Sequence, residues 1–211
     1  MRSVLISIRP KWCELIASGK KTVEVRKTRP KLETPFKVYI YCTQDKYFTF
    51  CTDNGEQYTH IGNGKVIGEF VCDEIREIGF SPYNHGEYTC EERTYIEQTG
   101  LTFDEMFEYL DDGYGYGWHI SNLEIYDTPK PVGGFYKPGA LSADELHAFD
   151  ELCKYCSDTD YGKHASYGSP NGPIMCEGRF CDKAYQEYLD EKFALTCPPQ
   201  SWCYVEEVSQ P

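Results

Sequence analysis

The stretch Gly19–Arg26, with the sequence GKKTVEVR, decides the fold because it carries the chain from a short amphipathic helix directly into a β-strand. Pro10 suits the first position of that helix, and Gly19 allows the left-handed backbone that ends one. Between them, three apolar side chains recur on one helical face: Trp12, Leu15 and Ile16. We therefore predict a helix over residues 10–18 and a strand over residues 21–27.

Alternation along the predicted strand separates its side chains by kind. Val23 and Val25 point to one face, whereas Glu24 and Arg26 point to the other, about 6 to 7 Å apart, with Lys21 at the entrance of the strand. Such a charged face is often an ordinary solvated surface, with a cross-strand ion pair worth about 0.2 to 1 kcal/mol. Spacing alone leaves this interpretation open beside that of a binding site.

The pattern Gly-x-Lys-x-x-Glu-x-Arg between a helix and a strand, here Gly19, Lys21, Glu24 and Arg26, resembles the signature of the ASCH domain family. These domains are PUA-like small β-barrels related to RNA-binding modules. The resemblance implies an α+β fold built on a PUA-like small mixed β-barrel. It also implies that the motif residues line a ligand cleft beside the first helix.

Three further segments carry the same resemblance. Residues 7–12, SIRPKW, resemble the first strand running into the first helix, and residues 118–126, WHISNLEIY, resemble the late strand. Residues 198–205, PPQSWCYV, resemble the closing strand of phage-type members. The resemblance therefore covers residues 1 to 130 and returns after residue 198.

Charge is distributed unevenly along the chain. Residues 1–37 hold ten basic and three acidic residues, a net charge of +7, whereas the remainder holds 11 basic and 31 acidic residues, a net charge of -20. This asymmetry indicates a basic site on an acidic body, which attracts one anionic ligand and disfavours indiscriminate coating by nucleic acid. Lysines dispersed over a solvated helix and strand would give the same count, so both interpretations stay open.

The other elements are predicted from local signals. A strong hairpin turn lies at Asn63-Gly64, and Thr102 with Glu105 forms a capping box at the start of a helix. Short apolar runs predict further strands at 3–8, 36–42, 65–78 and 113–118, and a helical pattern covers 89–98. We predict three parts: a barrel over 1–135, a helical and cysteine-rich insert over 136–197, and a closing strand over 198–211.

Eleven cysteines in a chain that shows no secretory pattern argue against a disulfide framework, because cytosolic thiols are kept reduced. Cys13, Cys42 and Cys72 fall inside helix or strand patterns and are predicted to be small core residues. No run approaches the length of about 18 apolar residues that a membrane span needs. We expect a cytoplasmic monomer that does not associate with membranes.

Two cysteine pairs bracket a segment with too little apolar content to form its own core, residues 157–173. They are Cys153-x2-Cys156 and Cys176-x4-Cys181, with 19 residues between them. Two close pairs around a spacer of about 15 to 20 residues are typical of a four-thiolate structural zinc site. Four other residues could replace a ligand: His147, His164, Cys197 and Cys203. Unliganded, buried thiols remain the alternative.

The first functional hypothesis is binding of RNA or a nucleotide-like small molecule. Lys21 and Arg26 would hold phosphate or carbonyl oxygens, and Glu24 would accept a hydrogen bond from a base amino group. Two neighbours on the helix side, Arg9 and Trp12, would complete the cleft. Tyr116 alternates with other aromatic residues, so it could stack on an unpaired base.

The second hypothesis is an enzyme. Some ASCH relatives are amidohydrolases of acylated cytidine nucleosides and use a lysine, a threonine three residues later and a glutamate before the next helix. Lys21 matches the lysine, but Glu24 stands at the threonine position and Thr99 at the acid position, which leaves Glu97 as a displaced candidate. Glu24 could then act as a general base, with Lys21 stabilising an oxyanion.

Other ASCH relatives are ribonucleases, in which a lysine and glutamate pair would perform the acid and base work. A third class of function is an acidic protein-interaction module, in which the acidic remainder of the chain and the cysteine cluster form a protein-binding face. The sequence ranks binding first, catalysis second and protein interaction third.

The zinc site gives a direct prediction. Protein purified without added zinc should contain about one equivalent of the metal, since four thiolates bind zinc tightly enough to be retained. Elemental analysis of the purified chain measures this ratio. A zinc content far below one equivalent would require the site to be abandoned.

Overall fold

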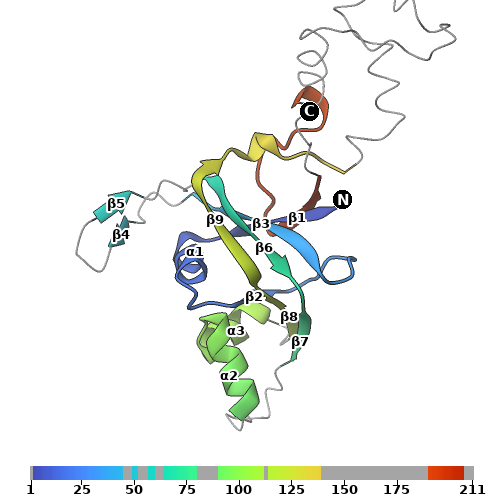
Figure 1. Cartoon of the computed structure of the whole chain (residues 1–211). Helices are drawn as coiled ribbons and strands as arrows, with labels where there is room; N and C mark the ends of the chain where they lie inside the picture. The colour runs from blue at the N-terminus through green and yellow to red at the C-terminus, as the bar shows by residue number, and fades with distance from the viewer. Residues whose placement is uncertain are drawn as a thin grey trace, which may run out of the picture. The chain divides into compact units, whose positions relative to one another are not determined.

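In a computed structural model of the chain, the structure describes residues 2–44, 49–51, 57–59, 64–79, 90–111, 114–138 and 190–206 (Figure 1). The chain divides into two compact units. The larger unit comprises Arg2–Val132 and Pro198–Tyr204 and contains the lysine, glutamate and arginine of the motif. The smaller unit takes in the described residues between Gly133 and Cys197 together with Val205 and Glu206.

The main sheet has five strands in the order β10-β1-β3-β6-β9. Their bounds are β1 (Ser3–Ile8), β3 (Phe36–Cys42), β6 (Lys65–Cys72), β9 (Ser121–Lys130) and β10 (Trp202–Val205). β1 and β3 run parallel, with Ile6 opposite Ile40, so the intervening chain must cross over between them. β3 pairs antiparallel with β6, and β6 pairs antiparallel with β9.

A second sheet has three antiparallel strands in the order β2-β8-β7. Their bounds are β2 (Val23–Arg26), β7 (Ile75–Gly79) and β8 (Tyr114–His119). Two short strands, β4 (Thr49–Cys51) and β5 (Gln57–Thr59), pair only with each other.

The fold is α+β, as predicted, but the described strands form open sheets and do not close into one hydrogen-bonded barrel. At two of the places where the chain changes sheet, the connection is short. β6 belongs to the main sheet, and after Asp73 and Glu74 the chain continues as β7 in the second sheet. β8 belongs to the second sheet, and after Ile120 the chain returns to the main sheet as β9.

The helices are α1 (Pro10–Ala17), α2 (Cys90–Thr99) and α3 (Phe103–Leu110), with a 3-10 turn at η1 (Val132–Gly134). The predicted end of α1 is confirmed, since Gly19 has a φ of 72°. The capping box of α3 is also confirmed: Thr102 accepts from the backbone N–H of Glu105, whose side chain accepts from the Thr102 N–H. No helix among the described residues is long and apolar enough to cross a membrane.

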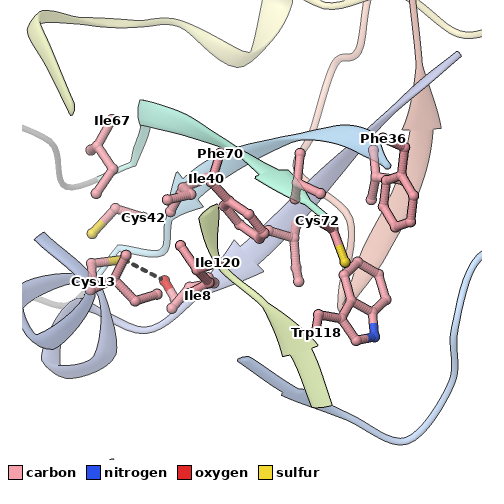
Figure 2. Close-up of a cluster of buried hydrophobic side chains, with 14 residues drawn as sticks. Ile8, Cys13, Phe36, Ile40, Cys42, Ile67, Phe70, Cys72, Trp118 and Ile120 are labelled. Carbon is pink, nitrogen blue, oxygen red and sulfur yellow. Dashed lines mark hydrogen bonds between the residues drawn. The ribbon is translucent and has the colours of Figure 1, made fainter. Parts of the chain in front are cut away.

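The main core lies where α1, the main sheet and β8 meet (Figure 2). Trp118 is fully buried and its ring meets Phe36 edge to face, with 6.0 Å between the ring centroids. The three cysteines predicted to be core residues, Cys13, Cys42 and Cys72, are all buried. Burial raises the pKa of the Cys72 thiol to about 12, so this residue behaves as a small neutral core side chain.

A smaller cluster covers the other face of the second sheet. It contains Val25 from β2, Ile78 from β7, and Met106 and Leu110 from α3. Because Trp118 packs against the opposite face, the second sheet is covered on both sides. All four residues of β2 are therefore buried, including the charged ones.

In the smaller unit, Tyr136 is bridged to both Ala194 and Glu206, and its hydroxyl donates to Asp190 at 2.5 Å. The predicted zinc ligands Cys153, Cys156, Cys176 and Cys181 lie outside the described residues, as do the possible substitutes His147 and His164. Cys197 is exposed and Cys203 is half-buried. Within the described ranges, no group of three or more His, Cys, Asp or Glu side chains is arranged to hold a metal ion.

Gly68 gives a test of the contact between β6 and β9. A Cβ at this position would lie 2.3 Å from the backbone oxygen of Glu124, which cannot move without breaking the ladder. We expect Gly68→Ala to lower the free energy of unfolding by about 1 to 3 kcal/mol, measured by urea denaturation. Gly134→Ala is the matched control, because no atom lies within 4 Å of its added methyl group. Equal stabilities of the two variants would contradict the close approach.

Candidate functional site

The three charged residues of the motif are buried together. Lys21, Glu24 and Arg26 are 2%, 6% and 8% exposed, respectively. The solvated strand face that spacing also allowed is therefore wrong. The reason is non-local: the main core covers one face of β2, while α3 covers the other.

Lys21 uses all three of its ammonium protons inside the protein. Nζ donates to the Val23 carbonyl at 2.8 Å and to the Thr99 carbonyl at 2.6 Å, and lies 3.2 Å from Oε2 of Glu24. Burial lowers the pKa of Lys21, although the nearby Glu24 carboxylate opposes this shift. Because an ammonium has three donors, Lys21 keeps none for a ligand.

Glu24 bridges the two cations. Its Oε1 lies 3.0 Å from Nη2 of Arg26, and its Oε2 faces Lys21. Nη2 of Arg26 also donates to the Ser7 carbonyl at 2.6 Å, and Nη1 makes a longer contact of 3.5 Å with Oγ of Ser201. Nε of Arg26 is buried without a hydrogen-bond partner among the described residues. The pair thus combines a carboxylate acceptor with unused guanidinium donors.

A cavity of about 690 Å³ opens beside this cluster. Its charged lining includes the exposed cations Arg9 and Lys27 and, from α3, Glu105 and Glu108. Two aromatic residues also line it: Trp12 and Tyr109. The volume lies within the range of about 300 to 1,000 Å³ that is usual for small-molecule sites.

Cations accompany both aromatic residues of the cavity. Nζ of Lys11 lies 4.3 Å from the centroid of the Trp12 ring, and Nζ of Lys27 lies 5.9 Å from that of Tyr109. Lys11 also forms an ion pair of 3.3 Å with Glu105, which joins α1 to α3. The backbone N–H of Thr102 and the Lys11 ion pair lower the pKa of Glu105, so its carboxylate is ionised.

The cavity brings together five of the residues predicted to form the ligand site: Lys21, Glu24, Arg26, Arg9 and Trp12. Tyr116 is not part of the lining, and its ring lies 6.0 Å from the guanidinium of Arg29.

The predicted catalytic set does not converge. Glu97 is exposed on α2 and does not line the cavity. The hydroxyl of Thr99 donates to the Ile96 carbonyl at 2.6 Å and accepts from the Leu101 N–H at 3.2 Å. The residue at the acid position of the catalytic relatives therefore offers Lys21 a backbone carbonyl instead of a carboxylate.

The sequence prediction missed several lining residues, among them Lys27, Tyr109 and Ser201. Tyr109 lies outside the apolar helical stripe that predicted α3, so no local signal marked it. Ser201 lies far along the chain and reaches the cavity because its backbone oxygen accepts from the N–H of Ser7 at 2.8 Å. Only the pairing of β10 with β1 could have revealed it.

The charge cluster predicts that substitutions of Glu24 and Glu105 differ greatly in their effect on the free energy of unfolding. Glu24→Gln leaves two buried cations without their carboxylate, so we expect the free energy of unfolding to fall by about 3 to 5 kcal/mol. The matched control Glu105→Gln breaks a partly exposed pair and keeps an oxygen for the capping box, so its loss should stay below about 1 kcal/mol. Urea denaturation measures both, and similar losses would contradict the buried cluster.

Comparison with known proteins agrees with this motif. The ASCH domain profile matches residues 6–127, more than half of the 211-residue chain. Among solved structures, ASCH from Zymomonas mobilis is 16% identical with a TM-score of 0.38, covering 91% of this chain and 96% of its own. Two mutants of that Zymomonas protein also match. One mutant is 15% identical with a TM-score of 0.37, and the alignment covers 91% of this chain and 99% of the mutant chain. The other mutant is 16% identical with a TM-score of 0.35, and the alignment covers 91% of this chain and 96% of the mutant chain. No curated protein matches significantly. The chain belongs to the ASCH domain family.

Proposed function

We propose that this protein binds single-stranded RNA or a nucleotide-like ligand in the cavity beside Glu24. The observation that carries the proposal is the Glu24 carboxylate, which is fixed between two buried cations and lines a cavity that also holds exposed cations. Membership of a family of PUA-like modules related to RNA-binding domains supports the same class of ligand.

A base is the part of the ligand that suits Glu24. The three donors of Lys21 are engaged, so the lysine positions the carboxylate and does not contact the ligand itself. An ionised carboxylate only accepts hydrogen bonds, so it selects an amino or imino group on a base edge. The guanidinium of Arg26, which also lines the cavity, suits a neighbouring carbonyl or ring nitrogen on the same edge.

The phosphate suits the exposed cations. Arg9 and Lys27 line the cavity and extend into solvent, so they can neutralise a phosphate without first losing internal partners. Tyr109 offers a ring beside Lys27 on which a base or sugar can pack. The net charge of -20 outside residues 1–37 disfavours wider contact with a polyphosphate, which supports a short bound segment.

These contacts favour binding over hydrolysis. The carboxylate at position 24 cannot replace a hydroxyl nucleophile without a change of mechanism, and the Thr99 hydroxyl is already engaged with backbone groups of its own helix and the residues that follow it. Lys21 is saturated by two carbonyls and a carboxylate, so stabilising an oxyanion would require it to lose one of them.

The test is a binding titration with a panel of short single-stranded RNAs and the four nucleotides, followed over a series of salt concentrations. Arg9→Ala and Lys27→Ala should each weaken RNA binding by about tenfold and reduce the salt slope by about one unit, since each removes one phosphate contact. Lys20→Ala is the matched control, because Lys20 is an exposed cation of the same basic segment that does not line the cavity.

Two outcomes would overturn the proposal. Equal effects of the three substitutions would mean that RNA responds to overall charge and not to this cavity. Turnover of acylated cytidines or of RNA by the same preparation, lost in Lys21→Ala, would establish an enzyme in place of a binding module.

A further inference from the structure

A second cavity, of about 430 Å³, lies on the face of the second sheet that carries Gly117 and Arg76. Strand alternation assigns residues to the two faces of this sheet. Glu24 and its partner Trp118 lie on one face. Val25 and its partner Gly117 lie on the other, together with Arg76 of β7, which also pairs with Gly117. The cavity is lined by two parts of the chain. The sheet and the segment before β7 contribute Glu74, Arg76, Gly117 and His119, and α2 contributes Thr94, Tyr95 and Gln98. None of these residues lines the cavity beside Glu24.

Tyr95 gives the cavity an unusual polar group. Its hydroxyl is buried and has no hydrogen-bond partner among the described residues. It lies directly on the backbone of β8, since a Cβ added to Gly117 would be only 2.0 Å from the hydroxyl oxygen. Burial raises the pKa of Tyr95 to about 12, so the hydroxyl keeps its proton at neutral pH. Buried hydroxyl groups normally have a hydrogen-bond partner, so this hydroxyl is a donor that lacks an acceptor among the described residues.

Arg76 and His119 line the same cavity as Tyr95. The guanidinium of Arg76 lies 5.3 Å from the centroid of the Tyr95 ring, and its Nε is 2.8 Å from Oε1 of Glu74. Nδ1 of His119 lies 2.6 Å from Oδ1 of Asp73, which leaves Nε2 as the ring nitrogen for another partner. Burial would raise the pKa of Asp73, but the contact with His119 and hydrogen bonds from Ser121 and its own backbone together outweigh burial, so the pKa is lowered and the carboxylate stays ionised beside the ring.

We propose that this cavity binds a small oxyanion, either a phosphate monoester or a carboxylate, through Tyr95, Arg76 and His119. An anionic oxygen would meet Arg76 in a charge-assisted hydrogen bond, and a shift of the Tyr95 side chain towards the cavity would give its buried hydroxyl the missing acceptor. Glu74, the acidic residue among the described lining residues, is already paired with Arg76. Thr94 and Gln98 add a hydroxyl and an amide from α2. The proposal is independent of RNA binding beside Glu24.

The test measures the melting temperature of the full chain with inorganic phosphate, acetate or chloride at one ionic strength. Phosphate or acetate should raise the melting temperature above that in chloride, and the more effective of the two identifies the source of the oxyanion. For Tyr95→Phe and for Arg76→Gln, the anion concentration needed for the same rise in melting temperature should increase by about tenfold. Arg93→Gln is the matched control, because it removes an exposed cation of α2 that does not line the cavity.

Tyr95→Phe also reports on the hydroxyl itself. Without added anion, this variant should melt at or above the wild-type temperature, because it removes a buried group that has no partner. A much lower melting temperature would reveal an internal partner and overturn the proposal. The proposal would also be overturned if neither anion stabilised the protein. Equal stabilisation of wild type, Tyr95→Phe and Arg76→Gln would overturn it as well, because the anion would then bind elsewhere, such as on the basic N-terminal segment.

Discussion

The burial of three charges on β2 and at its entrance is the constraint on which the rest of the larger unit depends. A buried charge is unfavourable unless it is paired and hydrogen-bonded, so the surrounding elements must bring acceptors to fixed positions. Lys21 requires the carbonyl of Thr99 at the end of α2, and Arg26 requires the carbonyl of Ser7 on β1. One short segment thus ties β1 to the end of α2, whose Thr99 lies 78 residues from Lys21.

Sequence signals predicted the elements whose causes are local. The capping box of α3, the glycine that ends α1 and the apolar runs of β1 and β3 each act within a few residues, and each was confirmed. The closed barrel was not, because closure depends on where strands change partners. The change from β6 to β7 takes place over Asp73 and Glu74, which carry no pattern that distinguishes a continued strand from a new sheet.

The candidate site shows the same division between local and distant causes. The motif placed Glu24 and Arg26 on one strand face, but a face becomes buried or solvated only through what packs on it, and Trp118, the core residue that pairs with Glu24, lies far along the chain on β8. For this reason the sequence could suggest that Lys21 contacts a ligand, whereas its contacts with Val23 and Thr99 use the same donors internally. The residue type was visible in the sequence, but its free hydrogen-bonding capacity was not.

The alternation of β8 explains how the second sheet carries a core on one face and closely packed helices on the other. Large aromatic side chains such as Trp118 fill the core on one face, while glycines alternate with them on the other. At Gly115 a Cβ would lie 2.5 Å from Leu110, and at Gly117 it would lie 2.0 Å from Tyr95, so each glycine admits a helix to the strand. The glycines are therefore packing sites for α2 and α3. Because α2 can approach so closely, the carbonyl of its last residue, Thr99, reaches Lys21. Thr94, Tyr95 and Gln98 of the same helix line the second cavity.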